Sequence, residues 1–134
     1  MKKFLCLLML SQLISGVQTV YAADDFLLGT YFGCYSPDYN ECLKTKKCMG
    51  NILHLKENHT GSESAGAGGR VSSDFTWKQV GDVITTTYKN TDKKRDSIYP
   101  KGAKGIITGL EPGVIFLTVK GEGEIFIHQS VCRP

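Results

Sequence analysis

Three turn signals in the second half of the chain separate runs of β-branched and aromatic residues, and they constrain the fold more than any other feature. The pair Gly81-Asp82 has glycine first, as a two-residue type II′ hairpin turn requires. Glu111-Pro112-Gly113 suits a type II turn, because proline presets φ and glycine accepts a positive φ. Gly121-Glu122-Gly123 closes the last hairpin. Three successive hairpins predict an up-and-down antiparallel meander.

Between the turns, apolar and polar side chains alternate with the two-residue period of a β-strand. Phe75 and Trp77 share one strand face, and Leu53 and Leu55 share another. Only residues 39–47 are expected to form a short helical turn. Eight strands are expected, at residues 26–35, 50–56, 73–80, 83–89, 96–99, 103–110, 114–120 and 124–131. The sequence therefore predicts a small, closed, lipocalin-like all-β barrel, since closure removes unpaired strand edges.

The N-terminal segment has the pattern of a cleaved secretory signal. Two lysines precede the apolar run at residues 4–17, and small side chains at Val20 and Ala22 suit a cleavage site. A membrane anchor is the alternative, but the run is short for a span and two polar residues interrupt it. We expect a signal over residues 1–22 and one β-barrel domain over residues 23–134. The expected location is the bacterial periplasm or the exterior, with no membrane span in the mature chain.

The expected mature chain keeps four cysteines, Cys34, Cys42, Cys48 and Cys132. An even number of cysteines in a small exported domain is typical of disulfides. Three pairings are possible. We favour Cys42–Cys48, which closes a short local loop, together with Cys34–Cys132, which requires the first and last strands to lie side by side.

A metal site is the alternative use of this region. Cys48, Met49, His54 and His59 are soft or borderline ligands within a short stretch, and copper(I) favours such donors. The chain has no C-x-x-C pair, so the spacing differs from that of zinc sites. We expect disulfides, and neither a metal nor a cofactor.

Basic residues gather in a few segments, although the formal net charge of the whole chain is only +3. We expect a contact surface for an acidic partner at seven of them, Lys44, Lys46, Lys47, Arg70, Lys93, Lys94 and Arg95. The alternative is a set of solvated loops. Aromatic residues do not interleave with these cations except at Tyr88 and Tyr99, so we do not expect nucleic-acid binding.

Residues 61–73 are rich in glycine, serine and alanine. We expect a flexible loop between the second and third strands. It is either a plain connection or a mobile segment that contacts a partner.

The sequence lacks the common catalytic patterns G-x-S-x-G, H-E-x-x-H and the P-loop. Its three histidines fall on different elements. Glu122 and Glu124 share a strand face, but they flank a turn glycine and are expected to be solvated. We therefore expect no enzymatic activity.

The order of short motifs resembles that of small bacterial lipocalin-like barrels, including the N-terminal barrel of copper-resistance envelope lipoproteins. It runs from Gly29-Thr30-Tyr31-Phe32-Gly33 through Asn58-His59-Thr60-Gly61 to Phe75-Thr76-Trp77-Lys78 and the Gly-Asp hairpin. The likeness covers residues 29–87 and implies a barrel. The copper-resistance type carries a C-x-x-C near its first strand and a lipid-attachment cysteine. This chain has neither, so copper handling is not carried over.

Two functions are compatible with these features. In the first, loops of an exported barrel bind and inhibit a protein partner, as an inhibitor or immunity factor against a cell-wall-acting enzyme. In the second, the barrel holds a small apolar or amphipathic ligand against Tyr31, Phe75 and Trp77. A small eight-stranded barrel either fills its interior with its own side chains or holds one small ligand. We favour the first function.

Overall fold

The structure, a computed structural model, describes residues 26–34, 38–66 and 68–133. The predicted signal at residues 1–22 lies outside this part of the chain. The described elements are β1 (Gly29–Cys34), α2 (Tyr39–Thr45), β2 (Cys48–Leu55), β3 (Thr60–Ala65), β4 (Val71–Val80), β5 (Val83–Tyr88), β6 (Lys104–Glu111), β7 (Val114–Val119) and β8 (Glu122–His128).

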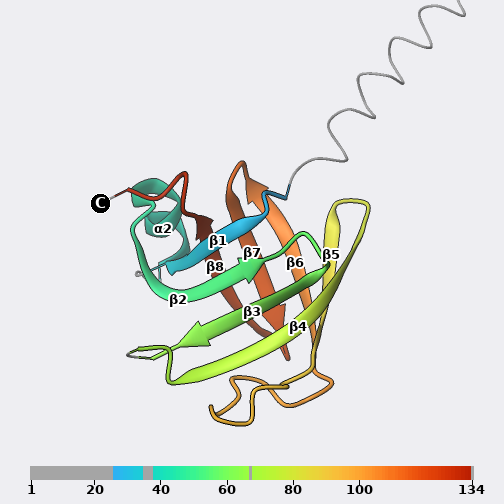
Figure 1. Ribbon diagram of the computed structural model, residues 1–134. Helices are drawn as coiled ribbons and strands as arrows, with labels where there is room; N and C mark the ends of the chain where they lie inside the picture. Colours follow the sequence, from blue (N-terminus) through green and yellow to red (C-terminus); the bar gives the residue numbers. More distant parts are fainter. Residues whose placement is uncertain (1–25, 35–37, 67, 134) are drawn as a thin grey trace, which may run out of the picture.

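The eight strands form one closed barrel in chain order (Figure 1). Every strand is antiparallel to the next, and β8 closes the ring on β1, with Tyr31 opposite His128. The predicted all-β up-and-down barrel is confirmed. Gly81 and Gly113 have φ values of 63° and 77°, the positive range for which their turns need glycine.

The barrel interior is filled by side chains that alternate inward along the strands. The faces predicted for β2 and β4 are confirmed, because Leu53, Leu55 and Phe75 are buried and Trp77 packs against the same cluster. The other buried members of this cluster are Tyr31, Ile84, Tyr88, Ala103, Ile107, Ile115, Leu117, Val119 and Phe126.

A second apolar cluster lies outside the barrel wall, beneath α2. Val114, Ile125 and Ile127 point away from the interior and pack with Cys42 of the helix. Strands β7 and β8 therefore have apolar side chains on both faces, as strands covered on both sides require.

The predicted helical turn at residues 39–47 is present as α2, which has a polar cap at each end. The Asp38 side chain accepts a hydrogen bond from the Asn40 backbone N–H at 2.9 Å. At the other end, Lys46 adopts a left-handed φ of 51° and donates its backbone N–H to Cys42 O.

The prediction of a loop at residues 61–73 is wrong, because most of this segment belongs to β3 and the start of β4. Backbone pairing with β2 on one side and β4 on the other holds β3 without large apolar side chains. Gly61 is required there, since a Cβ atom would lie 2.4 Å from Cζ of Phe75.

The strand predicted at residues 96–99 is also wrong, because this segment lies in the β5–β6 loop, residues 89–103. The backbone N–H groups of Ile98 and Tyr99 donate to Ser73 Oγ, at 2.9 and 3.2 Å, instead of joining a sheet. Asp96 forms only an isolated bridge with Val71.

The four cysteines of the described residues form disulfides, but the predicted pairing is wrong. The bonds are Cys34–Cys42 and Cys48–Cys132, with Cα–Cα distances of 5.9 and 5.7 Å. The α2 helix carries Cys42 back to the end of β1. The C-terminal segment runs beside the start of β2, where Arg133 N donates to Lys46 O at 2.9 Å, and this places Cys132 next to Cys48.

Candidate functional site

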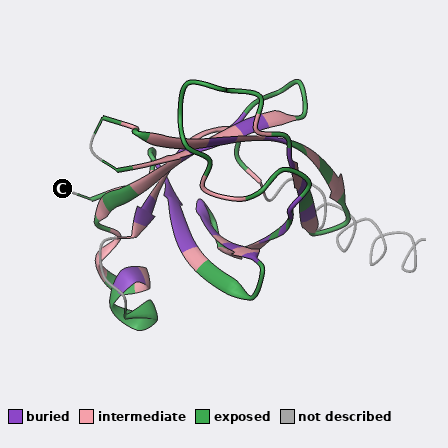
Figure 2. Cartoon of the chain, turned by 90° about the horizontal axis from the view of Figure 1, so that it is seen from below, coloured by how far each residue is buried: buried purple, intermediate pink, exposed green. Residues whose placement is uncertain are grey.

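A cleft of about 660 Å³ lies between the described residues of the β3–β4 connection, 66 and 68–70, and the β5–β6 loop. We call it the loop cleft. It is lined by Gly66, Gly68, Gly69, Arg70, Val71, Lys94, Arg95 and Asp96. Both segments lie at the same end of the barrel, because alternate connections of an up-and-down barrel share an end. Figure 2 looks onto the barrel from below, where the β5–β6 loop lies, and shows this loop as largely exposed.

Hydrogen bonds to β4 hold the β5–β6 loop in place. Ser72 N donates to Asp96 O at 2.8 Å, beside the cleft. Farther along β4, the Asp74 carboxylate accepts bonds from Thr91 N at 2.7 Å and Thr91 Oγ1 at 2.6 Å. Burial raises the pKa of Asp74, but the bonds from Thr91 outweigh it, so the pKa lies below its ordinary value. Hydrogen bonds therefore join the loop that forms one wall of the cleft to β4.

The charge of the loop cleft is predominantly positive. Arg70, Lys94 and Arg95 line it and are exposed, while Asp96 is the acidic residue of the lining. Arg95 Nε lies 3.8 Å from Asp92 Oδ2, but exposed pairs of this kind contribute little. The structure thus brings together three of the seven basic residues predicted to contact a partner. Lys93 is exposed in the same loop outside the lining.

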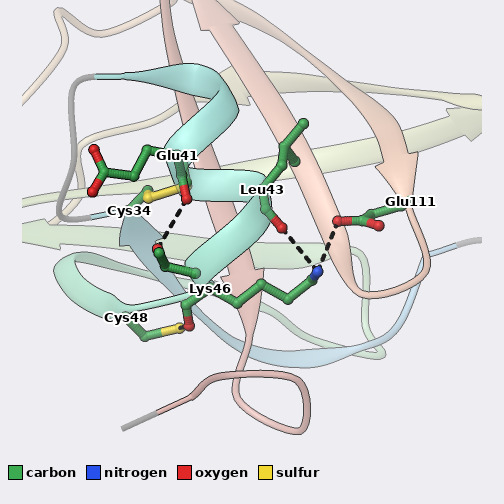
Figure 3. A network of polar contacts seen from close by, with 8 residues as sticks. Cys34, Glu41, Leu43, Lys46, Cys48 and Glu111 are labelled. Carbon is green, nitrogen blue, oxygen red and sulfur yellow. Dashed lines mark hydrogen bonds and ion pairs between the residues drawn. A yellow bond between two sulfur atoms is a disulfide. The ribbon is translucent and has the colours of Figure 1, made fainter.

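The three remaining lysines belong to α2 and the residues after it. Lys46 Nζ donates to Leu43 O at 2.9 Å and pairs with Glu111 Oε1 at 3.2 Å (Figure 3). This side chain ties the helix to the end of β6. Lys44 and Lys47 are exposed. The seven predicted contact residues therefore divide between two regions.

The aromatic residues predicted for a ligand site belong to the packed core or its edge. Tyr31 and Phe75 are 0% and 1% exposed. Tyr31 OH donates to Leu27 O at 2.6 Å, and burial raises its pKa to about 12 although this bond lowers it. Trp77 stacks on His59 with ring centroids 4.5 Å apart. Tyr31, Phe75 and Trp77 therefore pack against other residues of this chain.

The side chains of the proposed metal alternative have other roles. Cys48 is in a disulfide, and Met49 is 72% exposed. His54 Nδ1 lies 3.1 Å from Thr30 Oγ1, and His59 contacts Trp77. Over residues 26–34, 38–66 and 68–133, no group of three His, Cys, Asp or Glu side chains is arranged to hold a metal ion.

A polar region inside the barrel was missed by sequence reasoning. Glu63 of β3 is fully buried, and Tyr88 OH donates to its Oε2 at 3.4 Å. Glu124, expected to be solvated, is instead partly buried and accepts a hydrogen bond from Asn51 Nδ2 at 3.4 Å. The prediction that Glu124 is solvated is wrong because β8 turns this residue inward. The alternation of Gly61, Glu63 and Ala65 in a strand was the signal that could have placed Glu63 inside.

Comparisons with family models, curated proteins and solved structures found no match to this chain. The resemblance to lipocalin-like barrels remains a prediction, and a function must be argued from geometry. Among the residues described, no helix is long and apolar enough to cross a membrane.

Proposed function

We propose that this protein is a non-catalytic, extracytoplasmic β-barrel that binds and inhibits a protein partner through its loop cleft. The partner is an enzyme that acts on the cell wall. One observation carries the proposal: two loops far apart in sequence place Arg70, Lys94 and Arg95 around one cleft. Arginine is enriched among the residues that dominate protein interfaces.

The chemistry of the cleft favours an acidic surface. Glycan-cleaving enzymes use a pair of Asp or Glu side chains at their active sites. In the β3–β4 connection, Gly66, Gly68 and Gly69 have no side chains and adopt positive φ values. Arg70 follows these glycines and is exposed, and its charge is opposite to that of such an active site. Guanidinium groups pair with carboxylates in bidentate geometry.

The expected location supports this partner class. Disulfides persist in oxidising compartments, where enzymes of the cell wall also act. Two disulfides join described elements of this chain. N-terminal sequencing of exported material should give Ala23 as the first residue, and an intact Met1 would contradict export through a cleaved signal.

The test is a pull-down with the purified protein from envelope extract, followed by mass spectrometry of proteins and small molecules. A captured cell-wall hydrolase should lose activity when the protein is added. Binding should weaken as salt rises, because the contact is electrostatic.

A matched pair of double variants separates the cleft from general charge. Arg70→Gln with Arg95→Gln should weaken binding of the captured enzyme by at least about tenfold, the size expected for interface arginines. Lys56→Gln with Lys78→Gln removes the same charge from exposed positions on other elements and should leave binding unchanged. An equal loss of binding in both double variants would rule out the loop cleft as the binding site. Capture of a small apolar molecule alone, lost in Trp77→Phe, would favour the ligand-binding barrel.

A further inference from the structure

Two carboxylates lie near each other inside the barrel, at the end that carries the β5–β6 loop. Glu63 is 0% exposed, and its Oε1 has no hydrogen-bond partner. Glu124 is close enough for its charge to raise the pKa of Glu63. Gly33 makes room for Glu124, since a Cβ atom there would lie 2.6 Å from Glu124 Oε1. A buried carboxylate oxygen without a donor is costly unless a ligand or a proton satisfies it.

Basic side chains do not compensate this pair among the described residues. The described residues form two ion pairs, Lys46–Glu111 and Arg95–Asp92, and neither involves Glu63 or Glu124. Besides burial, the charge of Glu124 raises the pKa of Glu63, and the side chains of Tyr88 and Asn51 lower it. The region therefore provides hydrogen-bond acceptors and, once its carboxylates ionise, negative charge, which a proton or a cation from outside the described chain can neutralise.

Aromatic rings complete the surroundings. Tyr88 contacts Tyr99, with ring centroids 4.7 Å apart, and Phe75 at 5.4 Å. Tyr99 belongs to the β5–β6 loop, and the charges of Glu63, Glu124 and Glu122 all raise its pKa, after burial. The charges of all three carboxylates therefore act on Tyr99. Aromatic faces attract cations, most strongly where water is excluded.

A further hydroxyl points into this part of the interior. Thr86 Oγ1 is buried without a partner in hydrogen-bond geometry. Thr86 lies two residues before Tyr88 on the inward face of β5. Its side chain lowers the pKa of the Tyr88 hydroxyl. An ammonium group brings three donors, which matches two carboxylates and nearby hydroxyl oxygens.

We propose that this acidic end of the barrel, formed by Asn51, Glu63, Thr86, Tyr88, Tyr99, Glu122 and Glu124, binds a protonated amine. The ammonium group pairs with the Glu63 and Glu124 carboxylates, and the alkyl part contacts the partly exposed ring of Tyr99. This goes beyond partner binding at the loop cleft and does not depend on it.

The three carboxylates differ in burial. Glu122 is exposed, Glu124 is partly buried and Glu63 is fully buried, so acidic groups lie at increasing depth from the surface. A group of like charges raises the local concentration of counter-ions around it. An amine is favoured over a metal ion because the described residues offer no group of three acidic, His or Cys ligands arranged around one point.

The test uses the protein labelled with ¹³C-glutamate and NMR of the side-chain carboxyl carbons in phosphate buffer. The probe is n-butylamine, which is protonated at pH 7.5, and n-butanol is the neutral control. We expect saturable shifts of the Glu63 and Glu124 signals with the amine and none with the alcohol. Binding should weaken at least about tenfold on acidification from pH 8 to pH 5, because a proton competes for the same carboxylates.

Two variants make the result specific. Glu63→Gln keeps the shape and should weaken n-butylamine binding at least about tenfold, or about 1.4 kcal/mol. Glu57→Gln changes an exposed residue in the β2–β3 connection and should bind as the wild type does. Circular dichroism confirms that each variant is folded, and Glu124→Gln serves as the second test if Glu63→Gln is not. Absence of a saturable shift, an equal response to n-butanol, or a response to Ca²⁺ alone would overturn the proposal.

Discussion

Replacing Glu63 with glutamine is expected to stabilise the protein above neutral pH and to leave its stability almost unchanged near pH 4. Burial is the main cause that raises the pKa of Glu63 from 4.5 to about 7, and the charge of Glu124 adds to it. In the unfolded chain the same group ionises near its ordinary pKa. Between these two values the unfolded state has released a proton that the folded state retains. The free energy of unfolding therefore falls as pH rises through this window.

The size of the effect follows from the shift. One pKa unit corresponds to about 1.4 kcal/mol, so the stability lost between pH 4.5 and 7 is on the order of 3 kcal/mol. Glu63→Gln removes the ionisable group and keeps an oxygen that can accept the bond from Tyr88 OH. The variant should lack this part of the pH dependence and exceed the wild type by a similar amount at pH 8.5.

Urea unfolding at several pH values between 4 and 9, followed by circular dichroism, measures this difference. The buffers should be acetate, phosphate and borate, because an amine buffer would occupy the acidic end if it binds amines. Contributions of ionisable groups that do not interact with Glu63 cancel in the difference between variant and wild type. Glu57→Gln, at an exposed position, should follow the wild-type curve. The reasoning fails if Glu63→Gln and the wild type lose stability in parallel as pH rises.

Three further predictions address the disulfides, the turn and the tryptophan. The oxidised mature protein should have no reactive thiol in a titration without reductant, since its cysteines form two disulfides; two or more thiols would contradict the pairing. Deleting Gly68 and Gly69 should abolish partner binding and change the unfolding free energy by less than about 1 kcal/mol, because loop-closure entropy varies slowly with length; binding by the shortened protein would exclude the turn. Trp77→Phe should cost about 1–2 kcal/mol in urea unfolding, because it removes the indole bond to Thr60 O at 2.9 Å; an unchanged midpoint would show that this bond contributes nothing.

The barrel could be predicted from the sequence because its main signals are local. The inward faces of β2 and β4 follow from alternation, and the turns at Gly81 and Gly113 follow from conformations that favour glycine. The continuous apolar run of β7 does not alternate, so its two faces could not be assigned from the sequence pattern alone. Both of its faces are buried because α2 covers the outer face, and this cover is a tertiary contact.

The parts that were mispredicted depend on contacts between distant residues. The strand β3 has few strand-forming residues and is held by pairing on both sides. Gly61 looks like a loop residue until the Phe75 ring is placed over it. The disulfide partner of Cys34 depends on the direction in which α2 returns, which spacing does not determine.

The candidate sites were predictable to different degrees. Basic loop residues are visible in the sequence, and strand order then brings Arg70 and Arg95 to one end of the barrel. Glu63 could not be found in the same way, because its inward position follows from β3 being a strand. Because β3 was predicted to be a loop, the buried position of Glu63 was not predicted.

The two proposed sites share the β5–β6 loop, and this has an energetic consequence. The loop presents Lys94 and Arg95 to the cleft, while Tyr99 contacts Tyr88 inside the barrel. If both proposals hold, an amine bound at the acidic end neutralises negative charge beneath the loop. The electrostatic potential at the loop cleft then becomes more positive, because all charges of the protein contribute to the potential over its surface. An acidic partner therefore binds the loop cleft more tightly. Linkage requires the converse, so the acidic partner must also strengthen amine binding by the same factor.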